Sequence, residues 1–157
     1  MIRYMVFYFL FITSSYAQFD WSDNGVPIRQ GLHIEWQRTG DANSDGTMIY
    51  AWSDCRNGVR DIVVQKVERD GDEGKNLWGA HGIVVVRTDG RQEDPQLVTD
   101  GAGGAYIIWM DYSNESDSEG DIYAQHVLDD GSLVWGLGGT ALANQSGTQA
   151  SPNICSD

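Results

Sequence analysis

The sequence is poor in cysteine, proline, histidine and basic residues. Of its 157 residues, two are cysteine, three are proline and three are histidine. Ten Lys and Arg side chains stand against 23 Asp and Glu side chains, so the formal net charge is −13. Because a nucleic-acid-binding surface presents positive charge to phosphates, this balance excludes nucleic acid from the expected partners. With two cysteines, the chain is also not a small scaffold held by several disulfides.

Long hydrophobic runs are missing too, apart from one short run near the N-terminus. Arg3 precedes the apolar run 4–12, and Ser15 and Ala17 stand at the −3 and −1 positions of a small-residue cleavage site. This order is typical of a secretory signal peptide, and the run is about half of the roughly 20 residues that a membrane-spanning helix needs. We therefore predict a signal peptide at 1–17, export to the cell surface or extracellular space, and a mature form that does not span a membrane. An uncleaved membrane anchor is the alternative.

What the sequence has instead is a repeat with a period of 57 residues. Trp21, Trp78 and Trp135 follow one another at this interval, and so do Trp52 and Trp109. A regular period of this kind indicates tandem structural units. The flanking segments also correspond: 46–54 with 104–111, 60–67 with 120–127, 69–79 with 129–136, and 91–100 with 148–157.

Each unit is predicted to form four short strands. In the second unit the strand candidates are 95–99, 105–111, 121–128 and 139–143, separated by the Gly, Asp and Asn clusters of turns. Segment 105–111 is apolar on both faces, which indicates a sheet that is covered on both sides. We therefore predict an all-β fold of tandem four-stranded antiparallel units, as in the blades of a β-propeller. A two-sheet β-sandwich is the alternative.

The period also divides the chain into parts. Because a propeller closes with about 4–8 blades, we expect the chain to be a fragment of a longer repeat region. The first strand would then complete the last blade of the ring. After the signal peptide, the β-repeat region 18–157 comprises the final strand of a preceding unit (21–29), unit one (34–87), unit two (91–143) and the start of unit three (148–157).

The motifs of the second unit resemble those of a known class of repeats. In order they are Q-x-x-P at 92–95, G-x-x-x-x-W-x-D at 104–111, D-I-Y-A-Q at 121–125 and D-G-x-x-x-W-G at 130–136. They resemble the propeller-type repeats of large secreted or surface proteins of bacteria, many of which end in a C-terminal sorting domain. The resemblance implies an extracellular, many-bladed parent protein with no recurring catalytic residue. The first unit departs from it, because Glu35 replaces the Gln and Arg38 the Pro.

One loop of the first unit has the pattern of a calcium-binding loop. Asp41, Asn43 and Asp45 precede Gly46 in the order D-x-N-x-D-G, which can direct oxygen ligands onto Ca²⁺. The motif does not recur in the second unit, and Trp52 stands where an EF-hand carries its bidentate Glu. Ca²⁺ is thus the one cofactor that the sequence suggests, and a solvated turn is the alternative.

A second candidate for binding is Trp36, which has no counterpart in the repeat because Glu93 stands at its position. An exposed, unpaired aromatic ring can stack on a sugar, so Trp36 is a candidate ligand-binding residue, with local core packing as the alternative. The tryptophans that do recur are expected in the core, and His126 is expected to point outward from its strand.

Acidic residues and cysteines give weaker indications. The loop 111–121 carries five carboxylates, which could form a glycosidase-type pair or a solubilising connection. No nucleophile and base are placed together by motif, so we predict no catalytic residue. Cys55 and Cys155 occupy different positions in the repeat. We expect free thiols or disulfide partners outside this segment, with a bond between the two as the alternative.

Together these features predict a secreted or cell-surface protein of the β-propeller repeat type. Its expected role is that of a non-catalytic binding or structural scaffold, whose variable loops recognise an extracellular carbohydrate or protein. The alternative is an extracellular carbohydrate-active propeller enzyme, a hydrolase or lyase, with acids contributed by several blades.

Overall fold

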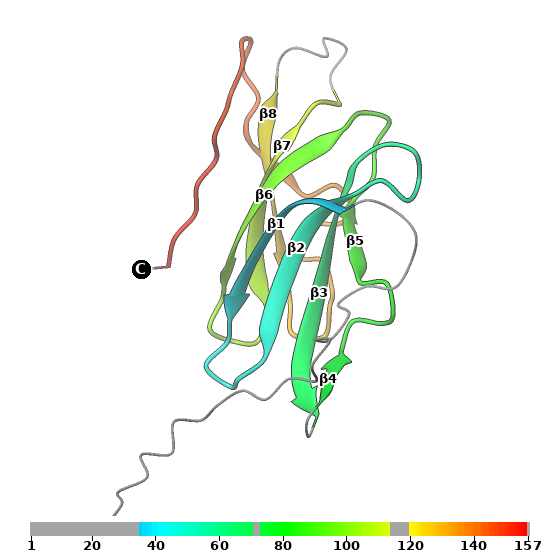
Figure 1. The fold of residues 1–157 in the computed structure, drawn as a ribbon. Coiled ribbons are helices and arrows are strands. Elements are labelled where there is room, and N and C mark those ends of the chain that lie inside the picture. The colour runs from blue at the N-terminus through cyan, green and yellow to red at the C-terminus, as the bar shows by residue number, and fades with distance from the viewer. Residues whose placement is uncertain (1–34, 71–72, 114–119, 157) are drawn as a thin grey trace, which may run out of the picture.

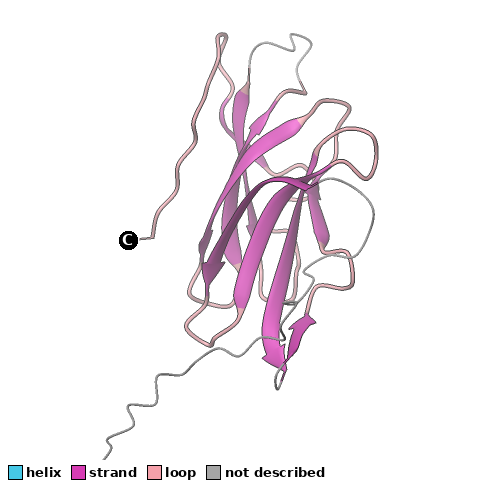
Figure 2. Ribbon diagram, in the orientation of Figure 1, coloured by secondary structure: helices cyan, strands magenta, loops and turns pink. Residues whose placement is uncertain are grey.

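The computed structural model describes residues 35–70, 73–113 and 120–156. Over these residues the chain forms nine strands in two antiparallel sheets and no helix (Figures 1 and 2). The predicted all-β fold is confirmed, whereas the propeller stays a prediction. The described part contains no helix that could cross a membrane. The predicted signal peptide and the strand 21–29 lie outside the described residues.

The first sheet has the order β1-β2-β3, with the edge beyond β3 shared by two short strands. One of these, β4, pairs with the second half of β3, and β5 pairs with its first half. The strands are β1 (Glu35–Ala42), β2 (Met48–Asp54), β3 (Asp61–Asp70), β4 (Glu73–Asn76) and β5 (Ile83–Val86).

The second sheet repeats this plan in the order β6-β7-β8-β9. A single bridge between Val127 and Leu133 takes the place that β4 has in the first sheet. Residues 144–156 form no strand. The strands are β6 (Gln92–Thr99), β7 (Ala105–Asp111), β8 (Asp121–Val127) and β9 (Thr140–Ala143).

The two sheets pack face to face and enclose one hydrophobic core. They come closest at their first strands, where β1 lies against β6 (Figure 1). The face of β2 that carries Ile49 and Ala51 meets the face of β7 that carries Ile107 and Trp109. Burial of these apolar side chains is the main force that joins the sheets. The remaining core residues are Ile62, Val64, Trp78, Val85, Val86, Leu97, Ala105 and Val127.

The backbone has the same irregularity in the first strand of each unit. Among the described residues other than glycine, φ is positive at Gln37 (45°), Asp94 (50°) and Ser151 (57°). In β1 and β6 this residue lies in a bulge, where the register with the next strand shifts. A bulge bends its strand and increases the local twist. The three residues are 57 apart in the sequence, so the bulge follows the period.

A glutamine in the third strand of each sheet fixes the segment that carries the repeated tryptophan. In the first sheet Gln65 donates to Gly79 O (2.6 Å) and accepts from Trp78 N (3.0 Å). In the second sheet Gln125 donates to Gly136 O (2.5 Å) and accepts from Trp135 N (3.0 Å). The amide nitrogen and the amide oxygen of each buried glutamine are therefore both hydrogen-bonded. The segment that carries the repeated tryptophan is held in the same way in both sheets.

Two glycines allow the chain to cross closely over the buried tryptophans. Gly82 has φ 72° and Gly139 has φ 69°, a conformation that favours glycine. A Cβ atom would lie 2.5 Å from Val64 O at Gly82, and 2.1 Å from Ala124 O at Gly139. Each chain segment can therefore continue into the last strand of its sheet only with glycine at this position.

Candidate functional site

The D-x-N-x-D-G loop is the tight turn between β1 and β2. Asp41 Oδ2 accepts hydrogen bonds from Thr99 N and Oγ1, both at 3.0 Å. Asp45 Oδ1 accepts from Thr47 N (2.8 Å) and Oγ1 (2.7 Å). The Thr99 backbone bond lowers the pKa of Asp41, and the Thr47 hydroxyl lowers that of Asp45. Asp41 thus connects the turn to the second sheet, whereas Asp45 stabilises the turn itself.

Asn43, the third residue of the predicted calcium site, supports the same turn from within. Its backbone N–H donates to Thr47 O (2.8 Å) and its side-chain amide donates to Thr47 Oγ1 (3.0 Å). Asn43 Oδ1 is buried and has no hydrogen-bond partner. In the part of the chain that the structure describes, no three His, Cys, Asp or Glu side chains are grouped as metal ligands. The loop is therefore a self-supported turn with one free buried oxygen.

An aspartate at the end of β2 is the most enclosed carboxylate of the first sheet. Asp54 accepts two hydrogen bonds at Oδ1 from Arg56, one from N (2.8 Å) and one from Nε (2.9 Å). At Oδ2 it accepts from Arg56 Nη2 (2.5 Å) and Trp52 Nε1 (2.9 Å). Burial raises the pKa of Asp54, but the bonds from Arg56 and Trp52 outweigh it and lower the pKa to about 2. Asp54 therefore stays charged and anchors the β2–β3 loop.

The second sheet has the same corner without the arginine. Asp111 accepts from Trp109 Nε1 (3.3 Å) and from Ser113 N (2.8 Å), and its backbone pairs with that of Asp121. Of the five carboxylates in the loop 111–121, only these two belong to the described residues. Both are buried at the base of the loop. Burial, followed by the charges of Asp111 and Asp121, raises the pKa of Tyr123.

Aromatic side chains gather on the face of the second sheet that points away from the first. The rings of Tyr106 and His126 stack with centroids 4.1 Å apart, and Trp135 lies 6.3 Å from each of them. His126 Nε2 lies 2.8 Å from Asp100 Oδ2. Burial raises the pKa of Asp100, but hydrogen bonds from His126, Ala102 N and Gly104 N outweigh it and lower that pKa.

This outer face corrects one expectation and identifies residues that sequence reasoning missed. The recurring tryptophans are buried as predicted at positions 52, 78 and 109, but Trp135 is exposed. The reason is that the described chain places no further sheet over it. Tyr106 was not singled out as a site residue, although it is the repeat counterpart of the apolar Ile49. An aromatic residue at that position was the signal that could have found it.

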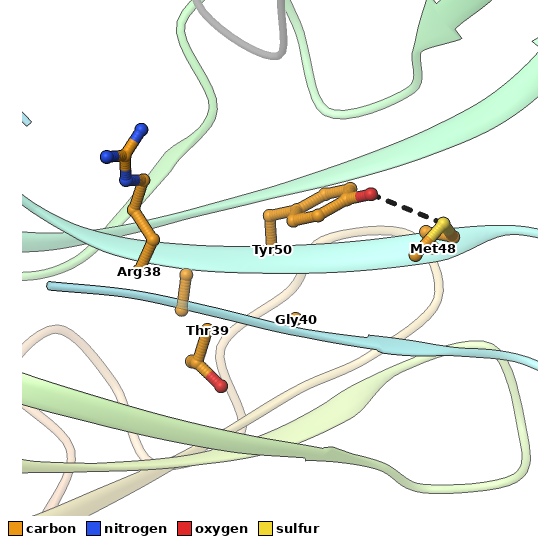
Figure 3. A pocket seen from close by; sticks show the side chains of 6 residues that line it. Arg38, Thr39, Gly40, Met48 and Tyr50 are labelled. Atoms are coloured by element: carbon orange, nitrogen blue, oxygen red, sulfur yellow. Dashed lines mark hydrogen bonds between the residues drawn. The ribbon is translucent and has the colours of Figure 1, made fainter. Parts of the chain in front are cut away.

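The opposite surface of the molecule carries a groove on the first sheet. It has a volume of about 410 Å³ and is lined by residues of β1 and β2 (Figure 3). At one end the Tyr50 hydroxyl donates to Met48 Sδ at 3.3 Å. Among the described residues that line the groove, none carries a carboxylate. The lining residues are Arg38, Thr39, Gly40, Met48, Tyr50 and Ala51.

The remaining candidates are Trp36 and the two cysteines. Trp36 lies in β1 and its backbone pairs with that of Ser53 in β2, whereas its side chain lies outside the described residues. Cys55 is half-buried, Cys155 is exposed, and the two are not bonded to each other. No family model matches the chain, and no curated protein is significantly similar to it.

Proposed function

We propose that this chain is part of a secreted or cell-surface repeat protein of the β-propeller type, which acts as a non-catalytic binding or structural scaffold. The observation that supports this best is the way in which the sheets join. The inner face of the second sheet, which covers the first, corresponds position by position to the opposite face of the first, where Gly40 and Tyr50 stand in the places of Leu97 and Ile107. Such head-to-tail packing can be extended by further units, as in a propeller, whereas two equivalent faces would close after one pair.

Polar contacts along the junction fit a rigid scaffold. At the first strands, Gln37 Nε2 donates to Asp94 Oδ1 (2.6 Å) and Asp94 N donates to Gln37 Oε1 (3.0 Å). At the outer edge, Lys66 Nζ donates to Gly103 O (2.8 Å) and to Asp129 Oδ1 (2.5 Å). These bonds fix the angle between the sheets at both ends of the junction, so the loops keep a constant spacing.

The buried carboxylates favour a non-catalytic role. Asp54 and Asp111 stand at corresponding positions and each accepts the indole N–H of a neighbouring tryptophan. A catalytic carboxylate must face a substrate, whereas these two hold the bases of loops. Recognition would then reside in the loops, whose sequences differ between the units.

The test is to express the full chain, recover it from the medium or the cell surface, and determine its N-terminus. The scaffold proposal expects a mature chain that begins near Gln18 and binds an extracellular glycan or protein without turnover. The same sample is assayed for cleavage of a panel of polysaccharides, with heat-denatured protein as control. Cleavage that disappears when Glu115, Asp117 and Glu119 are changed to amides would replace the scaffold with the carbohydrate-active enzyme. A chain that remains inside the cell would contradict the proposed location.

A further inference from the structure

We propose that the outer face of the second sheet binds the free face of the first sheet of a second copy of this chain. This inference rests on the proposed function, because it extends the same stacking of units from one molecule to the next. The outer face is defined here by Tyr106, His126, Trp135 and Leu142. The free face is the groove lined by residues of β1 and β2 (Figure 3).

Every residue of the outer face has a counterpart in the first sheet that is already buried by such packing. Trp78 is 7% exposed, whereas Trp135 is 41% exposed. Ile49 is completely buried, and its counterpart Tyr106 is 38% exposed. An exposed cluster of large apolar side chains is typical of an interaction site. In the first sheet, the corresponding surface is covered by the second sheet. We expect an equivalent sheet to cover the outer face when a partner binds.

The same comparison holds at the outer edge of the sheets. Val85 in β5 is completely buried, and its counterpart Leu142 in β9 is 61% exposed. Lys66 reaches across the junction, whereas its counterpart His126 stacks on Tyr106 within its own sheet. The apolar positions of the junction are thus preserved on the outer face, while its buried cation is replaced by an aromatic ring.

The free face of the first sheet corresponds to the surface that accepts this packing. Leu97 and Ile107 of the second sheet belong to the core between the sheets. Their counterparts in the first sheet are Gly40 and Tyr50, which line the groove. The occupant of the groove is therefore expected to resemble the buried face of β2.

The side chains on the two surfaces differ in size from their buried counterparts. Within the chain, Ile49 and Leu97 share one buried cluster. On the outer face the larger Tyr106 replaces Ile49, and in the groove Gly40 replaces Leu97. In the groove the Tyr50 ring lies where a Cβ atom of Gly40 would stand, so this ring fills the place of the Leu97 side chain and the opening of about 410 Å³ lies beside it. The phenol ring of Tyr106 is the group that would enter the groove.

The C-terminal segment lies on the same side as the outer face (Figure 1). Gln149 N donates to Gly120 O at 2.8 Å, as Gln92 N donates to Arg60 O at 2.8 Å. Residues 150–156 therefore occupy the place where the first strand of the bound copy would lie. They form no strand, and most of them are exposed, so a bound copy can displace them.

The two surfaces differ, so each copy can bind one neighbour on each side. Such a heterologous contact produces rings or open series rather than a dimer closed by two-fold symmetry. The test uses analytical ultracentrifugation of the full chain with single substitutions on the two faces. Tyr106→Asp places a charge on the outer face, and Met48→Asp places one in the groove. Each is expected to raise the dissociation constant of self-association at least about tenfold.

Mixing the two variants gives the decisive result. Each retains one intact face, so an equimolar mixture is expected to form a dimer that neither variant forms alone. Val134→Ser is the matched control, because its counterpart Leu77 remains 36% exposed even in the covered sheet. Circular dichroism confirms that the variants fold, and Trp135→Ser replaces Tyr106→Asp if that variant does not.

A chain that ends at Thr148 provides the second measurement, since it no longer places residues 150–156 on the outer face. It is expected to associate at least as tightly as the full chain. A monomeric full chain, a mixture that remains monomeric, or loss of association on truncation would each overturn this inference. None of these results affects export or ligand binding, so they are distinguishable from a failure of the proposed function.

Discussion

The two sheets of this protein have one backbone plan but bury different fractions of their repeated side chains. In the first sheet, the face with Ile49 and Trp78 is covered, and Lys66 is almost fully enclosed. In the second sheet, the face with Tyr106 and Trp135 is exposed. The local sequence therefore determines the strands and turns, whereas the neighbouring sheet determines which tryptophan contributes to the core.

The largest expected difference between the sheets concerns their outer tryptophans. Trp78→Ala removes a buried indole that donates from Nε1 to Asp129 O at 3.0 Å, and is expected to lower the free energy of unfolding by about 3–5 kcal/mol. Trp135→Ala removes a partly exposed ring and is expected to cost at most about 1 kcal/mol in the monomer. Urea denaturation of both variants at low protein concentration gives this comparison. Equal losses would mean that Trp135 is covered within the monomer.

The second difference concerns Lys66, the buried cation between the two sheets. The Lys66 side chain is 3% exposed, whereas that of its partner Asp129 is 68% exposed. Asp129→Ala leaves the ammonium group with Gly103 O, and is expected to cost about 2 kcal/mol. Lys66→Met in the Asp129→Ala background is expected to restore part of this loss, because it removes the unpaired charge.

His126→Phe is the matched change in the second sheet. It keeps the stacking on Tyr106 and loses only the bond to Asp100, so its cost is expected to be below that of Asp129→Ala. Thermal unfolding of the three variants ranks them. A larger loss for His126→Phe would mean that the contact between His126 and Asp100 stabilises the fold more than the contact between Lys66 and Asp129.

Most of the strand pattern followed from the sequence because it depends on local chemistry. Segment 105–111 was predicted as a strand with two apolar faces, and it forms β7 with those bounds. The predicted strand 139–143 contains β9. Turn glycines and alternating side chains specify such elements within a few residues, without knowledge of the neighbouring sheet.

The division of the fourth strand and the exposure of Trp135 could not be predicted in this way. β4 and β5 pair with different halves of β3 along the same edge, and the apolar pattern of this segment does not mark the break between them. Exposure of Trp135 depends on whether a further sheet covers it, which the described residues do not supply and to which the repeat pattern is insensitive. The hydrogen bonds of Asp41 were missed for a related reason, because its partner Thr99 is 58 residues away.

A third comparison concerns the aspartates that close the β2–β3 and β7–β8 loops. The pKa of Asp54 is lowered from 3.8 to about 2, so its charge stabilises the fold above pH 4 and this stabilisation is lost as the pH falls toward 2. Asp54→Asn is expected to cost about 2 kcal/mol at pH 7 and progressively less below pH 4.

Asp111→Asn is the matched control, because Ser113 N takes the place of Arg56 N there and no guanidinium of the described residues donates to Asp111. Its cost is expected to be about 1 kcal/mol, the contribution of an ordinary hydrogen bond. Urea denaturation between pH 3 and pH 7 measures both variants. If Asp54→Asn shows the same loss at every pH, its carboxylate is not the charged anchor inferred from the structure.

The smallest expected effect concerns Ca²⁺ and the D-x-N-x-D-G turn, which exists only in the first sheet. Asp41 and Asp45 already accept hydrogen bonds from Thr99 and Thr47, so Ca²⁺ would have to replace these bonds to collect both carboxylates. We therefore expect millimolar Ca²⁺ to shift the melting temperature by less than about 1 °C, since a ligand stabilises a fold only in proportion to its binding. Asn43 Oδ1 is the oxygen without a partner, and Asn43→Ala tests whether it matters. A Ca²⁺-dependent rise in melting temperature that Asn43→Ala and Asp45→Ala both abolish, and that Mg²⁺ does not reproduce, would establish the predicted calcium site and require the turn to open around the ion.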